Sequence, residues 1–162
     1  MTPNELLAAG YRMGREMIHR MCDELTEDEF RHQPVPGANS AAWIVGHLAV
    51  VARRTAERLG ASDLPILTEE YIGRFSAVKK SAGAQSDLGS KSELLTLLDV
   101  CFEKLMEAVG KLPANALANP PVAPGPFAKH YGEAVLFGAM HVFLHCGQLS
   151  TIRRSLGKPP LA

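Results

Sequence analysis

Two histidines lie four residues apart in the most apolar part of the chain, GAMHVFLHCGQL. On an α-helix, His141 and His145 would lie about 40° apart around the axis and about 6 Å apart along it, so both side chains can reach one point. Burying unpaired imidazoles is unfavourable, whereas their neutral nitrogens are good ligands for zinc, nickel, copper or iron. The spacing therefore predicts two ligands of a divalent metal. The alternative is a pair of core or interface histidines, because an isolated HxxxH pattern arises easily by chance.

A metal site needs at least a third ligand. The segment NSAAWIVGHLAVVARR places His47 among apolar residues, one helical turn after Trp43 and on the same face. If this segment faces the later one in a helical bundle, three imidazoles converge in the core, where bundles hold metals. His47 is therefore a candidate third ligand of a divalent metal beside His141 and His145, and a histidine packed in the core is the alternative. Since the ligands must be deprotonated, metal affinity is expected to fall as the pH drops through the region near 6.5.

Two further residues near these histidines are candidates for a supporting role. Gln148 follows His145 by three residues on the same helical face, so it could hydrogen-bond a ligand or a substrate. A polar residue at a bundle or dimer seam is an equally good interpretation of Gln148. Trp43 is interpreted as core packing in preference to a platform for a substrate.

The other three histidines are not expected to bind the same ion. His19 and His32 lie among charged residues, which indicates solvated side chains. His130 precedes His141 by eleven residues, which places it about 16 Å away along a helix axis.

The elements that must position these residues are four long helical segments. They are expected from Pro3 to about Glu24, from Asn39 or Ser40 to Gly60, from Ser90 through GKL, and from about Lys129 to Leu156. No alternating strand pattern appears, so the sequence predicts an all-α four-helix bundle forming one domain over 1–162, with a long link at about 61–90. Within that link, Tyr71 and Phe75 lie at helical spacing and either roof a pocket or anchor the link to the bundle.

Composition narrows the function classes. The 17 basic and 17 acidic residues give a formal net charge of +0 without a basic cluster, which argues against nucleic-acid binding. No secretory signal is visible, and the run AVLFGAMHVFLHC is too short to span a bilayer, so no membrane partner is expected. Three widely spaced cysteines, Cys22, Cys101 and Cys146, indicate buried reduced thiols in a cytoplasmic protein.

The two histidine segments also resemble a known family. PVPGANSAAWIVGHLA, followed much later by HVFLHCGQLSTIRRSLGKP, is similar to the DinB/YfiT-like superfamily, whose members are regarded as metal-dependent enzymes. Its pattern is a helix-two histidine after an N-S-x-x-W start, then H-x-x-x-H-x-G-Q, and His47, His141 and His145 match its three histidines. Cys146 stands where many relatives have arginine. The resemblance implies an up-down-down-up four-helix bundle, a three-histidine divalent metal site and frequent dimers. With it, we predict that His47, His141 and His145 bind one divalent metal, zinc or nickel, with water completing the shell.

Two reactions suit an ion held by three neutral histidines. The ion can lower the pKa of a bound water toward about 7 for hydrolysis, or it can bind a thiol as an activated thiolate. We therefore expect a hydrolase or a thiol-dependent S-transferase acting on a small molecule, with a low-molecular-weight thiol in the second case; relatives of both kinds, and a thiol-dependent isomerase, are implied by the resemblance. No catalytic acid or base is assigned, since Glu133 is offset from the histidine face and nothing places Glu69 or Glu70 over the site.

Two further expectations concern an alternative function and the oligomeric state. A non-catalytic metal-binding bundle, acting as a sensor or stress-response partner, is the alternative to an enzyme. A homodimer is expected because the last helix carries apolar residues over more of its circumference than packing within one bundle would bury.

Overall fold

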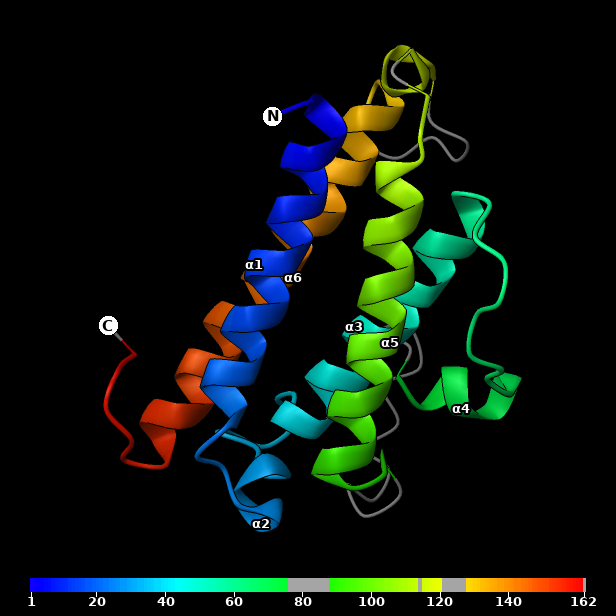
Figure 1. Cartoon of the computed structure of the whole chain (residues 1–162). Coiled ribbons are helices and arrows are strands. Elements are labelled where there is room, and N and C mark those ends of the chain that lie inside the picture. Colours follow the sequence, from blue (N-terminus) through cyan, green and yellow to red (C-terminus); the bar gives the residue numbers. More distant parts are fainter. Residues whose placement is uncertain (76–87, 114, 121–127, 162) are drawn as a thin grey trace.

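Four long helices make up most of the computed structural model, which describes residues 1–75, 88–113, 115–120 and 128–161 (Figure 1). In chain order the elements are α1 (Pro3–Cys22), α2 (Glu27–Phe30), α3 (Ala41–Arg58), α4 (Glu69–Arg74), α5 (Lys91–Gly110), the 3-10 helix η2 (Ala116–Ala118) and α6 (Tyr131–Ser155). The described residues form no sheet. In Figure 1, α1 and α6 run in one direction while α3 and α5 run in the other. The predicted all-α, up-down-down-up bundle is therefore confirmed.

The helices begin where side chains can satisfy their first backbone N–H groups. Thr2 and Glu5 form a reciprocal capping box at α1, as do Ser90 and Glu93 at α5. The Ser40 hydroxyl accepts from a backbone N–H in the first turn of α3. These caps set the residue at which each helix begins.

The ends of two helices depend on glycine. Gly60 after α3 and Gly157 after α6 have φ values of +84° and +74°, in the left-handed region that favours glycine. The first helix ends at Cys22, slightly before the expected Glu24. The observed ends of α3 and α6, Arg58 and Ser155, lie two and one residues before the predicted Gly60 and Leu156.

Two close helix pairs form the core. α1 packs on α6, and α3 packs on α5. A Cβ on Gly14 of α1 would overlap Val142, and one on Gly138 of α6 would overlap the Tyr11 hydroxyl, so these glycines allow α1 and α6 to approach closely. The Tyr11 hydroxyl donates to the Val135 carbonyl across the same contact (2.8 Å). This contact fixes the rotation of α6, and with it the side that carries the histidines.

The cysteines and the apolar surface of α6 complete the core description. All three cysteines are buried and free, as predicted. The 25-residue α6 is, by length and composition alone, apolar enough to cross a membrane, which the shorter apolar run in the sequence did not suggest. One side of α6 packs on α1, and 39% of its most apolar window is buried. The large apolar side chains that α6 leaves exposed are Leu136, Phe137, Met140, Phe143 and Leu144.

A buried arginine ties α6 to the end of α1. Arg153 is only 2% exposed. Its guanidinium donates to the Met21 carbonyl (3.2 Å), the Glu24 carboxylate (3.1 Å) and the Pro159 carbonyl (3.3 Å). The last carbonyls of a helix have no intrahelical partner, so a cation placed there satisfies them and the helix dipole together.

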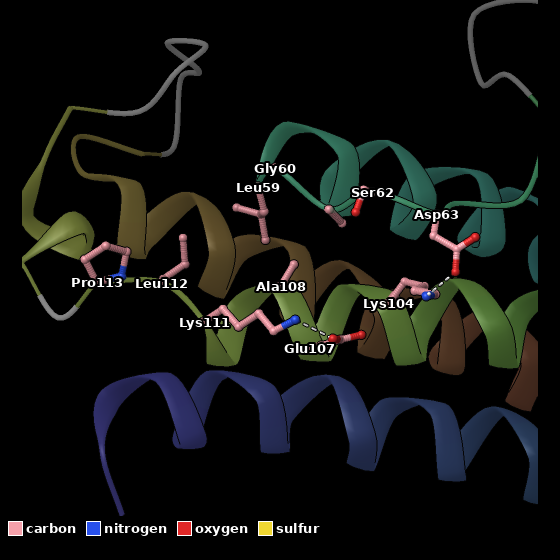
Figure 2. Close-up of a pocket in the computed structure, with 11 residues that line it drawn as sticks. Leu59, Gly60, Ser62, Asp63, Lys104, Glu107, Ala108, Lys111, Leu112 and Pro113 are labelled. Carbon is pink, nitrogen blue, oxygen red and sulfur yellow. Dashed lines mark hydrogen bonds and ion pairs between the residues drawn. The ribbon is translucent and has the colours of Figure 1, made fainter.

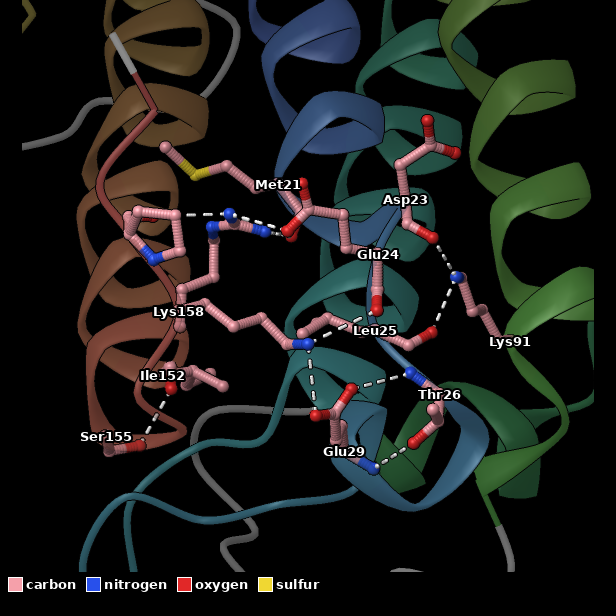
Figure 3. Close-up of polar contacts among 12 residues, drawn as sticks. Met21, Asp23, Glu24, Leu25, Thr26, Glu29, Lys91, Ile152, Ser155 and Lys158 are labelled. Carbon is pink, nitrogen blue, oxygen red and sulfur yellow. Dashed lines mark hydrogen bonds and ion pairs between the residues drawn. The ribbon is translucent and has the colours of Figure 1, made fainter.

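Two lysines from distant segments bind the same corner (Figure 3). Lys91, at the start of α5, donates to the carbonyls of Asp23 (2.9 Å) and Leu25 (2.7 Å). Lys158, just after α6, forms an ion pair with Glu29 of α2 (3.1 Å). We call Arg153, Lys91 and Lys158 the α1 clamp, because together they join the end of α1 to α5, α6 and the C-terminal segment.

Candidate metal centre

The three predicted histidines meet between α3 and α6. His47 lies in the middle of α3, and His141 and His145 lie in the middle of α6. One nitrogen from each ring falls within 4.8 Å of the other two. The ring of His47 is centred 5.4 Å from that of His141 and 5.1 Å from that of His145. The structure therefore brings together residues almost a hundred positions apart in the sequence.

The closest approach in the cluster has the dimensions of a metal site. The Nε2 atoms of His141 and His145 are 3.1 Å apart. Two nitrogen ligands at about 2.1 Å from one ion, at angles of roughly 90° to 109°, lie about 3.0–3.4 Å apart. Without a metal, the same separation is a hydrogen bond in which His141 Nε2–H donates to His145 Nε2, because His145 carries its hydrogen on Nδ1. The positions of these two rings therefore also fit one divalent ion.

Hydrogen bonds assign the protons on two of the rings. His47 Nδ1 is 2.8 Å from the Phe75 carbonyl oxygen, and His145 Nδ1 is 3.0 Å from the Gln148 side-chain oxygen. Both oxygens only accept, so each Nδ1 carries a hydrogen and each Nε2 keeps a free lone pair. The Asn39 amide donates to the same Gln148 oxygen (3.3 Å), which supports its assignment. Metal-binding histidines usually donate their other ring nitrogen in this way.

Burial keeps the cluster neutral. It is the main cause that lowers the pKa of each of the three histidines. The effect is largest at His145, whose pKa falls to about 4 because burial and the neighbouring His141 and His47 outweigh the opposing bond to Gln148. The metal-free cluster therefore offers uncharged nitrogens well below the ordinary histidine pKa, and protons compete for these ligands at lower pH than the sequence predicted.

Comparison with known proteins identifies the family. The sequence profile described as the DinB superfamily matches residues 11–149, which include all three histidines. This chain belongs to the DinB superfamily. A crystal structure titled as the conserved protein of a locus from Enterococcus faecalis has a similar fold, with a TM-score of 0.75 and 16% sequence identity over 98% of this chain and 99% of that one. No functionally curated protein matches the sequence.

The link between α3 and α5 supports the histidines of this DinB-superfamily protein. Phe75 is buried at the end of α4, and its ring lies 5.1 Å from that of Tyr71. The two aromatic residues therefore anchor the link to the bundle, one of the two roles considered for them. The hydrogen bond from His47 to the Phe75 carbonyl was not foreseen, because a backbone acceptor gives no signal in residue type.

Trp43 combines packing with contact to the site. Its indole stacks on His47 with ring centres 4.7 Å apart and an interplanar angle of 9°. The indole N–H donates to the Arg74 carbonyl (3.2 Å). Trp43 is half-buried and lies between the histidine cluster and the end of α4.

The carboxylates considered for catalysis lie elsewhere. Glu69 and Glu70 are exposed, and Glu70 pairs with Arg74 (2.9 Å). Glu133 accepts from the backbone of Lys129 and His130 at the start of α6. None of these glutamates perturbs the pKa of the three clustered histidines.

The remaining histidines are accounted for by other contacts. His19 pairs with Asp99 (2.7 Å) on the surface between α1 and α5. His32 lies 3.0 Å from the Ser155 hydroxyl. His130 precedes α6 and caps it with Glu133.

Two cavities can be compared with the histidine cluster. A pocket of about 270 Å³ lies where α3 and α5 end (Figure 2). It begins at Leu59, about 18 Å along α3 from His47, and Lys104 in its wall is already paired with Asp63 (3.1 Å). A crevice beside His141 has about 10 Å³, room for one water molecule. Neither cavity gathers ligands as the three histidines do.

Proposed function

We propose that this DinB-superfamily protein is a metal-dependent enzyme acting on a small molecule, as a hydrolase or a thiol-dependent S-transferase. His47, His141 and His145 hold the ion, zinc or nickel. The observation that carries the proposal is the convergence of three neutral imidazoles on one small volume, with two of them aimed by acceptors at Nδ1. Membership of the superfamily adds support.

The ion would supply Lewis acidity that lowers the pKa of a bound water or thiol. The chain's own residues prepare the ligands for it. Gln148 and the Phe75 carbonyl hold the hydrogens of His145 and His47 on Nδ1. His141 is the most open of the three ligands, since it is half-buried where the others are buried. A substrate would therefore approach the cluster past His141.

The first test is elemental analysis of the purified protein, then titration of the metal-free protein with zinc and nickel. We expect one equivalent to bind, and binding to be lost in the variant with all three histidines replaced by alanine. A full equivalent retained by that variant after dialysis against a mild chelator would place the site elsewhere.

The second test separates the reactions. The loaded protein is offered an ester and amide panel, and separately an electrophile panel with low-molecular-weight thiols. Turnover in the first supports a hydrolase, and thiol consumption in the second supports an S-transferase. Tight metal binding without turnover in either panel would favour the non-catalytic sensor or stress-response bundle.

We also propose a homodimer that forms through the exposed apolar side chains of α6. Five large exposed apolar side chains on one helix form a larger apolar surface than the isolated hydrophobic residues usual on protein surfaces, and a second copy of the chain would cover it. Met140, the central one, is 59% exposed. A Met140→Glu variant should shift the mass measured by light scattering from dimer to monomer, and a wild-type monomer at micromolar concentration would contradict the proposal. We propose cytoplasmic action without nucleic-acid or membrane partners, supported by the zero net charge and the buried free thiols.

A further inference from the structure

Two successive backbone carbonyls at the end of α4 accept hydrogen bonds from two aromatic side chains of α3. The Arg74 carbonyl accepts from the Trp43 indole (3.2 Å), and the Phe75 carbonyl accepts from His47 Nδ1 (2.8 Å). Trp43 and His47 are one turn apart, and their rings are nearly parallel. Both N–H donors therefore bind one short segment of backbone, whose carbonyls have no partner further along α4.

The ring of Phe75 holds that segment in place. It is 1% exposed and lies against the backbone of α3 at Gly46, the residue before His47. A Cβ at position 46 would overlap three atoms of the ring. Glycine inside a helix costs about 1 kcal/mol relative to alanine. The contact with Phe75 gives Gly46 a structural reason to be there.

The contact determines which nitrogen of His47 is available. In solution a neutral imidazole exchanges its hydrogen between Nδ1 and Nε2. The Phe75 carbonyl retains it on Nδ1, leaving the Nε2 lone pair for a ligand role. The position of the Phe75 ring against Gly46 thus controls both the tautomer and the orientation of His47.

We propose that Phe75, seated against Gly46, is the positioning residue for His47, so that metal affinity depends on a residue that is not itself a ligand. The proposal rests on the metal site proposed above. It also makes a claim about the metal-free protein, so the two can fail separately.

The first measurement is nitrogen-15 NMR of the histidine rings in the metal-free protein. In the wild type, His47 should show a protonated Nδ1 and an unprotonated Nε2. In Gly46→Ala, the displaced Phe75 ring should release the carbonyl, and the His47 signals should become those of mixed tautomers. Gly73→Ala is the matched control, since a Cβ there meets no atom within 4 Å.

The second measurement is zinc affinity by chelator competition. Loss of a group that orients a metal-binding histidine typically weakens affinity about 10- to 100-fold. Gly46→Ala and Phe75→Ala should both show such a loss, and Gly73→Ala should bind as the wild type does. In the double variant Gly46→Ala with Phe75→Leu, the shorter side chain makes room for the new methyl group, so affinity and the Nδ1–H signal should return.

Shortening Phe75 relieves the overlap and so restores packing as well as affinity, whereas the nitrogen-15 signals of the folded metal-free protein report the tautomer of His47 directly. The tautomer therefore separates positioning from stability. Wild-type tautomer and affinity in both Gly46→Ala and Phe75→Ala would overturn the proposal. A double variant no better than Gly46→Ala alone would also count against it. If the wild type bound no zinc, the proposed function would fail, and the NMR result would still decide the role of Phe75.

Discussion

The three-histidine cluster and the α1 clamp both place buried polar side chains of α6 against another helix. On α6, His145 and Arg153 are about two turns apart. The clamp joins opposites, because the Arg153 guanidinium meets two carbonyls and a carboxylate. Its Nε is the one buried side-chain nitrogen or oxygen of the described residues without a hydrogen-bond partner. The cluster joins like groups, since ring nitrogens of His47, His141 and His145 lie within 4.8 Å of one another.

The difference teaches which set of buried polar groups needs a further component. Donors that meet acceptors stabilise a fold without any further component. Ring nitrogens that converge are stabilised only where one of them carries a hydrogen, as in the His141–His145 contact, or where a cation lies between them. Burial lowers the pKa of His145 and so disfavours an added proton. The clamp is therefore structural, and the cluster is suited to a ligand.

The largest expected effect breaks the cluster. His141→Ala or His145→Ala removes one of three protein ligands, so zinc affinity should fall by at least about 1000-fold while the bundle stays folded. Chelator competition measures the affinity, and circular dichroism checks the helices. His19→Ala is the control, because His19 pairs with Asp99 outside the site. Equal losses in His19→Ala and His145→Ala would show that the effect is not local.

The next effect breaks the clamp. Arg153→Met keeps an apolar stem of similar length but loses the hydrogen bonds, so the free energy of unfolding should fall by about 3 kcal/mol. Lys158→Met, at a more exposed position, should cost less than about 1 kcal/mol. Denaturant titration of the metal-free protein measures both. If Arg153→Met instead weakened zinc binding more than it weakened folding, the clamp would belong to the site.

The fold could be predicted because its signals are local. Ser90 with Glu93 starts α5 through a side chain three residues from its partner, and Gly60 ends α3 through its own backbone freedom. The three histidines could be predicted for a similar reason, since helical spacing fixes which residues share a face.

Other contacts depend on backbone atoms from distant segments. The Phe75 carbonyl reaches His47 across 28 positions, and Arg153 reaches Met21 across 132. Every residue carries a carbonyl, so residue types did not reveal these acceptors. Gly46 was the one usable sign, a helical glycine beside a candidate ligand.

Acid should distinguish the two regions further. The pKa of His145 is lowered to about 4 in the folded protein, so the unfolded chain takes up protons first as the pH falls below about 6.5. Stability from this neutral histidine is therefore present above pH 6.5 and lost as the pH falls toward 4, by on the order of 2–3 kcal/mol. Denaturant titrations of metal-free wild type and His145→Gln at several pH values measure the difference. The two stability curves should converge toward pH 4, and parallel curves would contradict the prediction.

The smallest expected effect concerns Gln148, which lies in the cluster but makes a donor-to-acceptor contact of the kind found in the clamp, because its side-chain oxygen accepts from His145 Nδ1. Gln148→Leu removes the acceptor for His145 Nδ1 while keeping the size of the side chain, so zinc affinity should fall by about 10-fold. Gln148→Glu restores an acceptor and adds a negative charge beside the ion, so its affinity should equal or exceed that of the wild type. Chelator competition at constant pH compares the three proteins. If leucine and glutamate weakened binding equally, Gln148 would serve the seam between α3 and α6 through its bond with Asn39, and His145 would be held by packing alone.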